Sequence, residues 1–186
     1  MEQKTGNLVL CGLFAALMAV GAFLHIMLPI GPFQVTISLQ IFFAILAGLF
    51  LGPKHGFLSV LAYLVLGLAG VPVFARGGGL GYVLKPTFGF LLGFLCAAWA
   101  SGMPGGSARQ AGLKQQLLAA FGGEMGYYAA GLVYYYVMFN FVLQNAAGMG
   151  VVRLLEVWLF STVIPDSILC VLAVLVYRKL GPLVRR

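Results

Sequence analysis

The sequence predicts an all-α integral membrane protein, a bundle of six transmembrane helices in a single domain that covers residues 1–186. Three observations favour this class. Hydrophobic residues make up 62% of the chain and charged residues only 8%, whereas about a quarter of the residues of a soluble domain are charged. Apolar runs approaching the roughly 20 residues of a membrane span recur along the whole chain. Only short segments rich in glycine and proline separate them, which leaves no room for a soluble domain.

Six apolar runs are predicted to be the transmembrane helices. Clusters of glycine and proline separate the runs, and these residues interrupt helices. The third and fourth runs are shorter than a full span, so we expect them to tilt or to insert only partly. The six runs are Leu8–Leu28, Val35–Leu51, Gly56–Gly70, Thr87–Trp99, Leu113–Phe141 and Leu154–Tyr177.

The distribution of lysine and arginine predicts that both termini are cytoplasmic, because cytoplasmic loops carry the excess of these residues. With both termini inside, the cytoplasmic cations are Lys4, Lys54, Arg109, Lys114, Arg178, Lys179, Arg185 and Arg186. The exterior cations are Arg76, Lys85 and Arg153. This bias accounts for the net charge of +7, so the charge is no sign of nucleic-acid binding, and no nucleic-acid partner is expected.

The segment Gly70–Phe90 is predicted to be a shaped loop on the exterior side. Its glycines, prolines and cations would leave backbone groups and charges unsolvated inside a bilayer. The glycines allow positive φ angles and a close approach of the backbone to a small molecule. Arg76 and Lys85 add positive charge on either side of them. The loop is either the wall of a site for a small anionic molecule or an ordinary interhelical loop whose cations reach the membrane interface.

Asp166 and Glu124 are acidic residues within predicted spans, where an ionisable group is costly and is a functional hypothesis by default. Asp166 follows Pro165, so it either contacts a ligand or begins a helix whose positive end its charge stabilises. These two roles are compatible. Glu124 shares one side of its helix with Tyr127 and Tyr128. It either hydrogen-bonds a neighbouring helix, pairs with a cytoplasmic lysine or takes part in chemistry.

Gln40, Ala15 and Ala19 are further candidates for specific contacts. The Gln40 amide offers donors and an acceptor, which suits an amide-like or ureido ligand, although such an amide also joins helices. Ala15 and Ala19 lie four residues apart and form a small-residue side of the first run. Such a side lets another helix approach closely, either within this chain or in another subunit.

Several kinds of site are absent from the sequence. There is no Gly-x-x-x-x-Gly-Lys-Ser/Thr loop, so the chain is not expected to hydrolyse a nucleotide by that route. The glycine run is not a dinucleotide fingerprint, because Tyr82 stands where that pattern requires glycine. The thiols are far apart in sequence and give no metal or disulfide signature: Cys11, Cys96 and Cys170. No catalytic residue, metal or cofactor is therefore predicted.

Several motifs occur together between Leu10 and Trp99. They are Gly-Pro-Phe-Gln-Val-Thr-Ile-Ser-Leu-Gln ending at Gln40, Ala47–Pro53 with Gly56, Leu66–Phe74, the glycine run Gly77–Gly81, and Pro86–Phe90. With Ile164-Pro-Asp near the C-terminus, this set resembles the BioY family. That family comprises the biotin-specific substrate-binding (S) subunits of energy-coupling factor (ECF) importers.

The resemblance implies transport rather than catalysis. It implies a multi-pass S subunit of the bacterial cytoplasmic membrane that captures biotin from the exterior in a pocket beneath external loops. The implied partners are the lipid bilayer, a transmembrane coupling (T) protein and two cytosolic ABC-type ATPases, which would supply the ATP hydrolysis that this chain lacks. Ala15 and Ala19 resemble the docking feature on the first helix of the family.

The resemblance also implies individual site residues. By position, Gln40 and Asp166 resemble residues that line the biotin pocket, with Asp166 accepting ureido N–H bonds. The chain departs from the family at Leu169, where lysine is common, and in the glycine loop, where asparagine is common. We therefore expect Arg76 or Lys85 to supply the positive charge for the valerate carboxylate. The expected ligand-binding set is Gln40, Arg76, Gly77, Gly78, Gly79, Tyr82, Lys85 and Asp166.

Three alternatives stay open at the level of the sequence. The first is an S subunit for another small vitamin, which the departure at Leu169 allows. The second is a membrane-embedded enzyme that uses Glu124 or Asp166 as an acid or base, although no second catalytic group stands at a suitable spacing. The third is a stand-alone facilitator or channel, which uptake without coupling ATPases would favour.

Overall fold

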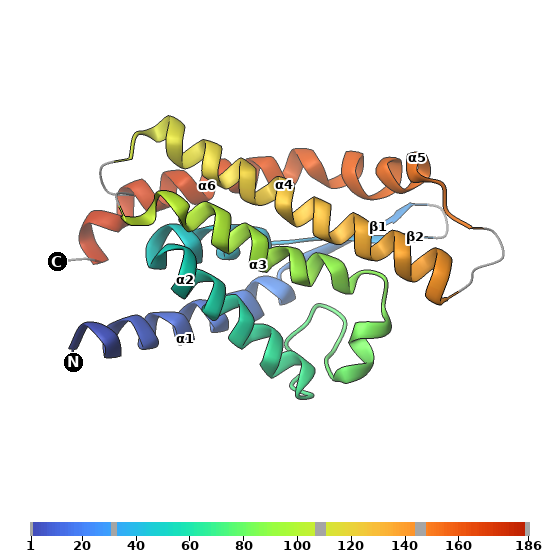
Figure 1. Cartoon of the computed structure of the whole chain (residues 1–186), viewed down its shortest axis with the longest axis horizontal. Coiled ribbons are helices and arrows are strands. Elements are labelled where there is room, and N and C mark those ends of the chain that lie inside the picture. Colours follow the sequence, from blue (N-terminus) through green and yellow to red (C-terminus); the bar gives the residue numbers. More distant parts are fainter. Residues whose placement is uncertain (1, 31–32, 107–110, 144–147, 185–186) are drawn as a thin grey trace.

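The computed structural model describes residues 2–30, 33–106, 111–143 and 148–184. Most of this part of the chain is helical, and two short strands that follow α1 in the sequence form a hairpin (Figure 1). The elements are α1 (Glu2–Phe23), β1 (His25–Ile30), β2 (Phe33–Ser38), α2 (Gln40–Leu68), η1 (Leu80–Leu84), α3 (Phe88–Gly102), η2 (Met103–Gly106), α4 (Leu113–Val137), η3 (Met138–Val142), α5 (Val151–Leu154), η4 (Leu155–Leu159) and α6 (Phe160–Val184). Here η1 and η2 are 3-10 helices, whereas η3 and η4 are π-helices.

Three helical segments of the described chain are long and apolar enough to cross a membrane: Gly6–Phe23, Gln40–Leu68 and Val151–Gly181. The last of these runs through α5, η4 and α6, and α3 is a shorter apolar helix. The coarser part of the prediction, a mostly helical membrane protein, is confirmed, whereas the bundle of six transmembrane helices stays a prediction.

Gly52 divides α2 into two arms. Its backbone has φ 79° and ψ 176°, a conformation that glycine adopts without the penalty of a side chain. Pro53 follows it and has no N–H to continue the hydrogen bonds of the first arm. A Cβ on Gly56 would lie only 2.8 Å from the Cα of Gly48, so the two arms touch beside the bend. The predicted break between the second and third runs is therefore present.

The strand hairpin corrects the all-α prediction. Residues at the end of the predicted run Leu8–Leu28 and at the start of Val35–Leu51 form the antiparallel strands β1 and β2, with His25 opposite Ser38. β2 alternates apolar and polar residues from Phe33 to Ser38, which is the period of a half-buried strand and not of a helix. The β-branched residues of β2 favour the extended form, because they pack well on a pleated surface. Val35 is fully buried, which anchors the hairpin to the core.

The other helices extend beyond the predicted runs or end before them. The run Thr87–Trp99 lies within α3 apart from its first residue, and α3 continues to Gly102. The run Leu154–Tyr177 is part of the continuous helix formed by α5, η4 and α6. The run Leu113–Phe141 covers α4 and most of the π-helical η3.

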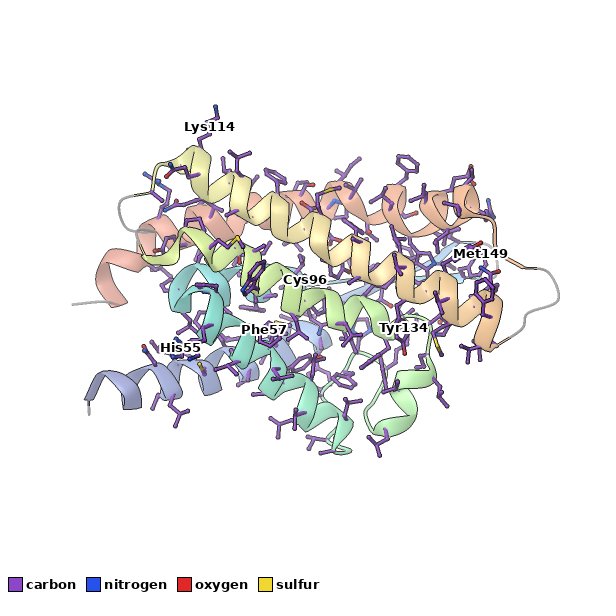
Figure 2. The ribbon with its side chains drawn as sticks, viewed as in Figure 1. His55, Phe57, Cys96, Lys114, Tyr134 and Met149 are labelled. Carbon is purple, nitrogen blue, oxygen red and sulfur yellow. The ribbon has the colours of Figure 1, made fainter. Side chains whose placement is uncertain are left out.

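The chain passes back and forth between two ends of the molecule. The start of α1 and the end of α6 lie at one end (Figure 1). His55, near the bend of α2, and Lys114, near the start of α4, lie at this same end, whereas Met149 lies at the opposite one (Figure 2). That opposite end also holds α5 and the turn side of the hairpin (Figure 1).

Two hydrophobic clusters hold the helices together. The larger one joins α1, α2, α3 and α6 and includes the fully buried Met18, Ile45, Val60 and Val174. The second joins β2 and α3 to α4 and to the helix from α5 to α6, and includes Val35, Phe90, Tyr128 and Trp158. A cavity lies where residues of the two clusters meet.

Candidate ligand-binding site

The inner cavity lies between β2, the loop before α3, and the helices α3, α4 and α6. The cavity itself is about 70 Å³, and the space between its walls, with the open mouth included, is about 580 Å³. Its aromatic walls are Tyr82, Phe90, Phe94, Tyr127 and Trp158. Its polar lining is Thr36, Ser38, Gln40, Arg76, Thr87 and Thr162. Apolar walls with a few polar groups suit a small ligand that is itself partly apolar.

A second and more open hollow, the outer vestibule, adjoins the inner cavity. Arg76, Thr87 and Trp158 line both spaces, so these three residues form the neck between them. The vestibule is otherwise lined by Phe33, Gln34, Lys85, Pro86, Tyr135, Phe139 and Gly148. Residues from the hairpin and from the connection before α5 place it at the end of the molecule opposite the termini (Figure 1). The inner cavity therefore opens towards the end that the sequence assigns to the exterior.

The structure places Gln40, the first residue of α2, on the cavity wall. Its Nε2 donates a 2.8 Å hydrogen bond to the Tyr63 hydroxyl, and its Oε1 accepts a 3.1 Å bond from Ser38 Oγ. Tyr63 in turn donates to the backbone carbonyl of Val73 at 3.2 Å. A side-chain amide has two N–H donors and two acceptor lone pairs. These bonds fix its orientation and leave one donor and one lone pair for a ligand.

Arg76 and Lys85 gather their charges at the mouth of the cavity. Arg76 Nη2 donates to the backbone oxygen of Gln34 at 2.9 Å and to Thr36 Oγ1 at 3.2 Å, which ties the glycine loop to β2. Lys85 Nζ donates to the backbone oxygen of Arg76 at 3.3 Å. The guanidinium lies at the neck and the ammonium in the vestibule. An anionic group at the neck would therefore be stabilised by charge-assisted hydrogen bonds.

Tyr82 connects the loop to the core. Its ring centroid lies 4.7 Å from that of Phe74 and 6.5 Å from that of Phe88, and the Lys85 ammonium lies 4.3 Å from the centre of its ring. Burial raises the pKa of the Tyr82 phenol, and the positive charge of Arg76 only partly opposes this shift. Tyr82 is therefore a neutral hydroxyl at physiological pH and can donate a hydrogen bond into the cavity.

Gly77, Gly78 and Gly79 shape the loop and do not line either space. Gly77 exchanges two backbone hydrogen bonds with Phe74, of 2.9 and 3.1 Å, which places Arg76 in the tight turn between them. Gly79 has φ 94°, and its N–H donates to the Gly67 carbonyl at the end of α2 at 2.7 Å. The glycines thus hold the loop on α2 so that Arg76 reaches the neck.

Asp166 lies behind the cavity wall. Its interpretation as the start of a helix is wrong, because α6 begins at Phe160 and continues the helix that starts at Val151. Its Oδ2 accepts a 2.7 Å hydrogen bond from the Tyr128 hydroxyl, which lies 2.8 Å from Thr162 Oγ1. Thr162 lines the cavity, whereas Asp166 is not among the lining residues. The carboxylate is therefore connected to the cavity through Tyr128 and Thr162.

Comparison with known proteins identifies the family. A sequence model of the BioY family matches residues 1–186. The chain belongs to the BioY family. A probable biotin transporter BioY from Lysinibacillus sphaericus is 40% identical over 179 residues, which are 96% of this chain and 88% of that relative. A second probable biotin transporter BioY, from Pyrococcus horikoshii, is 47% identical over 108 residues, 58% of this chain and 64% of the relative.

A solved structure shares the fold of this BioY family member. It is the crystal structure of the S-component for biotin from an ECF-type ABC transporter, with a TM-score of 0.80 and 25% sequence identity. The match covers 97% of this chain and 93% of that one. The names of these proteins are those of transporters and of a transporter component, so the interpretation as a transport protein rather than an enzyme is confirmed.

Trp158 and Thr162 line the cavity of this BioY family member but are not among the site residues expected from the sequence. Trp158 and Thr162 lie eight and four residues before Asp166, so helical spacing from Asp166 could have found them. Thr162 Oγ1 donates to the Trp158 carbonyl at 2.7 Å. The π-helical turn η4 contains Trp158, and such turns redirect side chains at functional sites. No periodic pattern in the sequence predicts that turn.

Glu124 joins α4 to α6 outside the lining of the cavity. It is 3% exposed, and its Oε1 accepts a 2.9 Å hydrogen bond from Ser167 Oγ. The predicted interhelical hydrogen bond is therefore present. Among the described residues, no three His, Cys, Asp or Glu side chains gather as they would around a metal ion.

Ala15 and Ala19 pack at least partly inside the chain. Ala15 is 6% exposed and belongs to the larger core cluster, and Ala19 packs against that cluster. Of the two roles that the sequence leaves open, close packing within the bundle is the one that the structure shows for Ala15. A docking role for this side of α1 stays a prediction.

Proposed function

We propose that this BioY family member is the S subunit that captures biotin for an ECF-type importer. The observation that carries the proposal is the inner cavity, with an amide and hydroxyl groups inside it, aromatic walls and a positively charged neck. Biotin combines a polar ureido ring, an apolar thioether ring and a chain that ends in a carboxylate. The names of the relatives and of the matching S-component support the same ligand.

The bicyclic head of biotin would lie in the inner cavity, and its valerate chain would pass through the neck. Gln40 then offers its free N–H and lone pair to the ureido group. At the opposite wall Thr162 Oγ1 accepts a ureido N–H, and Asp166 acts on this contact indirectly, through Tyr128. Arg76 and Lys85 bind the carboxylate in place of the family lysine. Leu169, which stands at the position of that lysine, lines a separate apolar groove beside α1 and the hairpin.

The membrane arrangement that we propose has one domain over residues 1–186 with six spans: α1, the two arms of α2, α3, α4 and the helix from α5 to α6. Both termini are on the cytoplasmic side of a bacterial cell membrane. The location of α1's start and α6's end on one side of the molecule supports this orientation. Lys114 and His55 lie at that same end (Figure 2). The vestibule then faces the exterior, where biotin is encountered.

The partners in transport would be a transmembrane T protein and two cytosolic ATPases. The absence of a P-loop from the sequence supports this division of labour, since the chain has no nucleotide-hydrolysing motif of its own. Accumulation of biotin by cells would then require all of these proteins. Accumulation without the ATPases would contradict the proposal and favour a facilitator.

Retention of biotin by the purified chain tests the proposal directly. We expect the chain, solubilised in detergent without any partner, to bind one biotin per polypeptide in equilibrium binding. A panel of other small vitamins is the control. Tighter binding of another vitamin would assign the subunit to that ligand, and binding of none would contradict a capture function.

A further inference from the structure

The indole of Trp158 carries a buried N–H group that makes no hydrogen bond of good geometry among the described residues, although it interacts with the Tyr135 hydroxyl. Trp158 is 6% exposed, and its ring is held by Phe90 at 5.4 Å and Tyr135 at 4.9 Å between ring centroids. A buried donor without a well-formed hydrogen bond is costly, so a ligand group that pairs with it fully would compete with Tyr135 for this N–H. The position of Trp158 at the neck places this donor where a ligand would pass.

The surroundings of the indole indicate which ligand group it would bind. The three neck residues are a guanidinium, a hydroxyl and an indole N–H, contributed by Arg76, Thr87 and Trp158. Among the described residues, neither space has an acidic side chain on its walls. Both hydrogen bonds of Arg76 to β2 are made by Nη2 alone, whereas a guanidinium has five N–H donors. A neck with donors and a positive charge favours an anion over a neutral group.

We propose that Trp158 and Arg76 together form the carboxylate subsite of the neck, and that the Trp158 indole N–H makes this BioY family member prefer acids over neutral ligands of the same shape. This inference rests on the proposed function for the ligand. It assigns to Trp158 a role as a specificity-determining residue. Tyr135 is the competing partner within the chain, because its hydroxyl interacts with the same indole.

The test compares biotin with biotinol, in which a primary alcohol replaces the carboxylate. We expect Trp158→Phe to weaken biotin binding about tenfold, as for the loss of a charge-assisted hydrogen bond, and to change biotinol binding by less than about twofold. Trp99→Phe is the matched control, since Trp99 is the other tryptophan of the chain and is 49% exposed. Tyr135→Phe should keep the preference for biotin.

An equal loss for both ligands in Trp158→Phe would overturn the inference but leave the capture function standing. A wild-type chain that binds neither ligand would instead contradict the proposed function. A second measurement covers the case in which Trp158→Phe does not fold. In the Trp99→Phe chain labelled with ¹⁵N-tryptophan, the single indole N–H resonance should move downfield with biotin and much less with biotinol. A resonance that responds equally to both would overturn the inference.

Discussion

Tyr128 on α4 donates a 2.7 Å hydrogen bond to Asp166 on α6, and this bond joins two helices directly behind the cavity. The same hydroxyl is 2.8 Å from Thr162, which lines the cavity. The bond therefore holds the carboxylate and the cavity wall in one arrangement. Its loss would affect both the stability of the fold and the shape of the site.

We predict that Tyr128→Phe destabilises the protein and weakens biotin binding. The change removes a donor from the buried carboxylate of Asp166, which costs roughly 1–3 kcal/mol for a buried group left unsatisfied. The apparent melting temperature in detergent and the biotin affinity measure the two effects. Tyr136→Phe is the matched control, because Tyr136 lies on the same helix and is only partly buried. Equal melting temperatures for the two variants would contradict the structural role of the bond.

The glycine loop gives a second prediction, which concerns Gly78. A Cβ at this position would lie 2.9 Å from the Gly67 carbonyl oxygen and in contact with the Val71 carbonyl, so Gly78→Ala must push the loop away from α2. Because the loop carries Arg76, we expect at least about tenfold weaker biotin binding. Gly81→Ala is the control, since a Cβ on Gly81 would meet no atom within 4 Å. Unchanged affinity in Gly78→Ala would mean that the loop position does not matter for binding.

The two cations at the mouth give a third prediction. We expect Arg76→Ala and Lys85→Ala each to weaken the binding of biotin, with the larger effect for Arg76, which lies at the neck. Arg76→Lys should recover part of the loss, because it keeps the charge but not the fork of donors that ties the loop to β2. The effects should shrink at high salt, which screens exposed charges. Full affinity in both alanine variants would show that neither cation contributes to the binding of biotin.

Much of this site could be predicted from the sequence, because burying a polar or charged side chain beside a membrane span costs free energy and is therefore rare without a function. A buried amide at Gln40 and cations beside a glycine run are unusual next to apolar spans, and the structure brings Gln40 and Arg76 to the same cavity. An ionisable Asp166 is similarly conspicuous. The Asp166 side chain nevertheless does not line the cavity and reaches it only through Tyr128 and Thr162. A pattern of hydrophobicity does not predict these hydrogen bonds.

The neck could not be predicted in the same way, whereas part of the hairpin left a signal in the sequence. β2 alternates apolar and polar residues, which is a strand signal, but the antiparallel pairing links residues across a turn. Trp158 is one apolar residue in an apolar run. Its place at the neck depends on the π-helical turn η4 and on ring contacts with Phe90 and Tyr135. Such contacts join distant parts of the chain, and single-sequence periodicity does not report them.

The orientation in the membrane gives a fourth prediction, which separates the two ends of the molecule. In a background with Cys11, Cys96 and Cys170 replaced by alanine, a cysteine is introduced either at Leu80, which is 76% exposed in η1, or at Lys114, near the start of α4. The positive-inside rule and the shared end of both termini assign Leu80 to the exterior and Lys114 to the cytoplasm. A maleimide that does not cross membranes should therefore label Leu80→Cys in intact cells. It should label Lys114→Cys only after the cells are permeabilised.

Retained biotin binding by each labelled variant shows that the cysteine background is folded. The reverse labelling pattern would place the vestibule on the cytoplasmic side, where a protein that captures biotin from outside could not use it. The capture mechanism would then have to be abandoned even if the purified chain bound biotin, because affinity alone does not establish the side from which a ligand enters. Orientation and binding must therefore agree for the neck, with its cations and its indole donor, to act as the entrance of an importer.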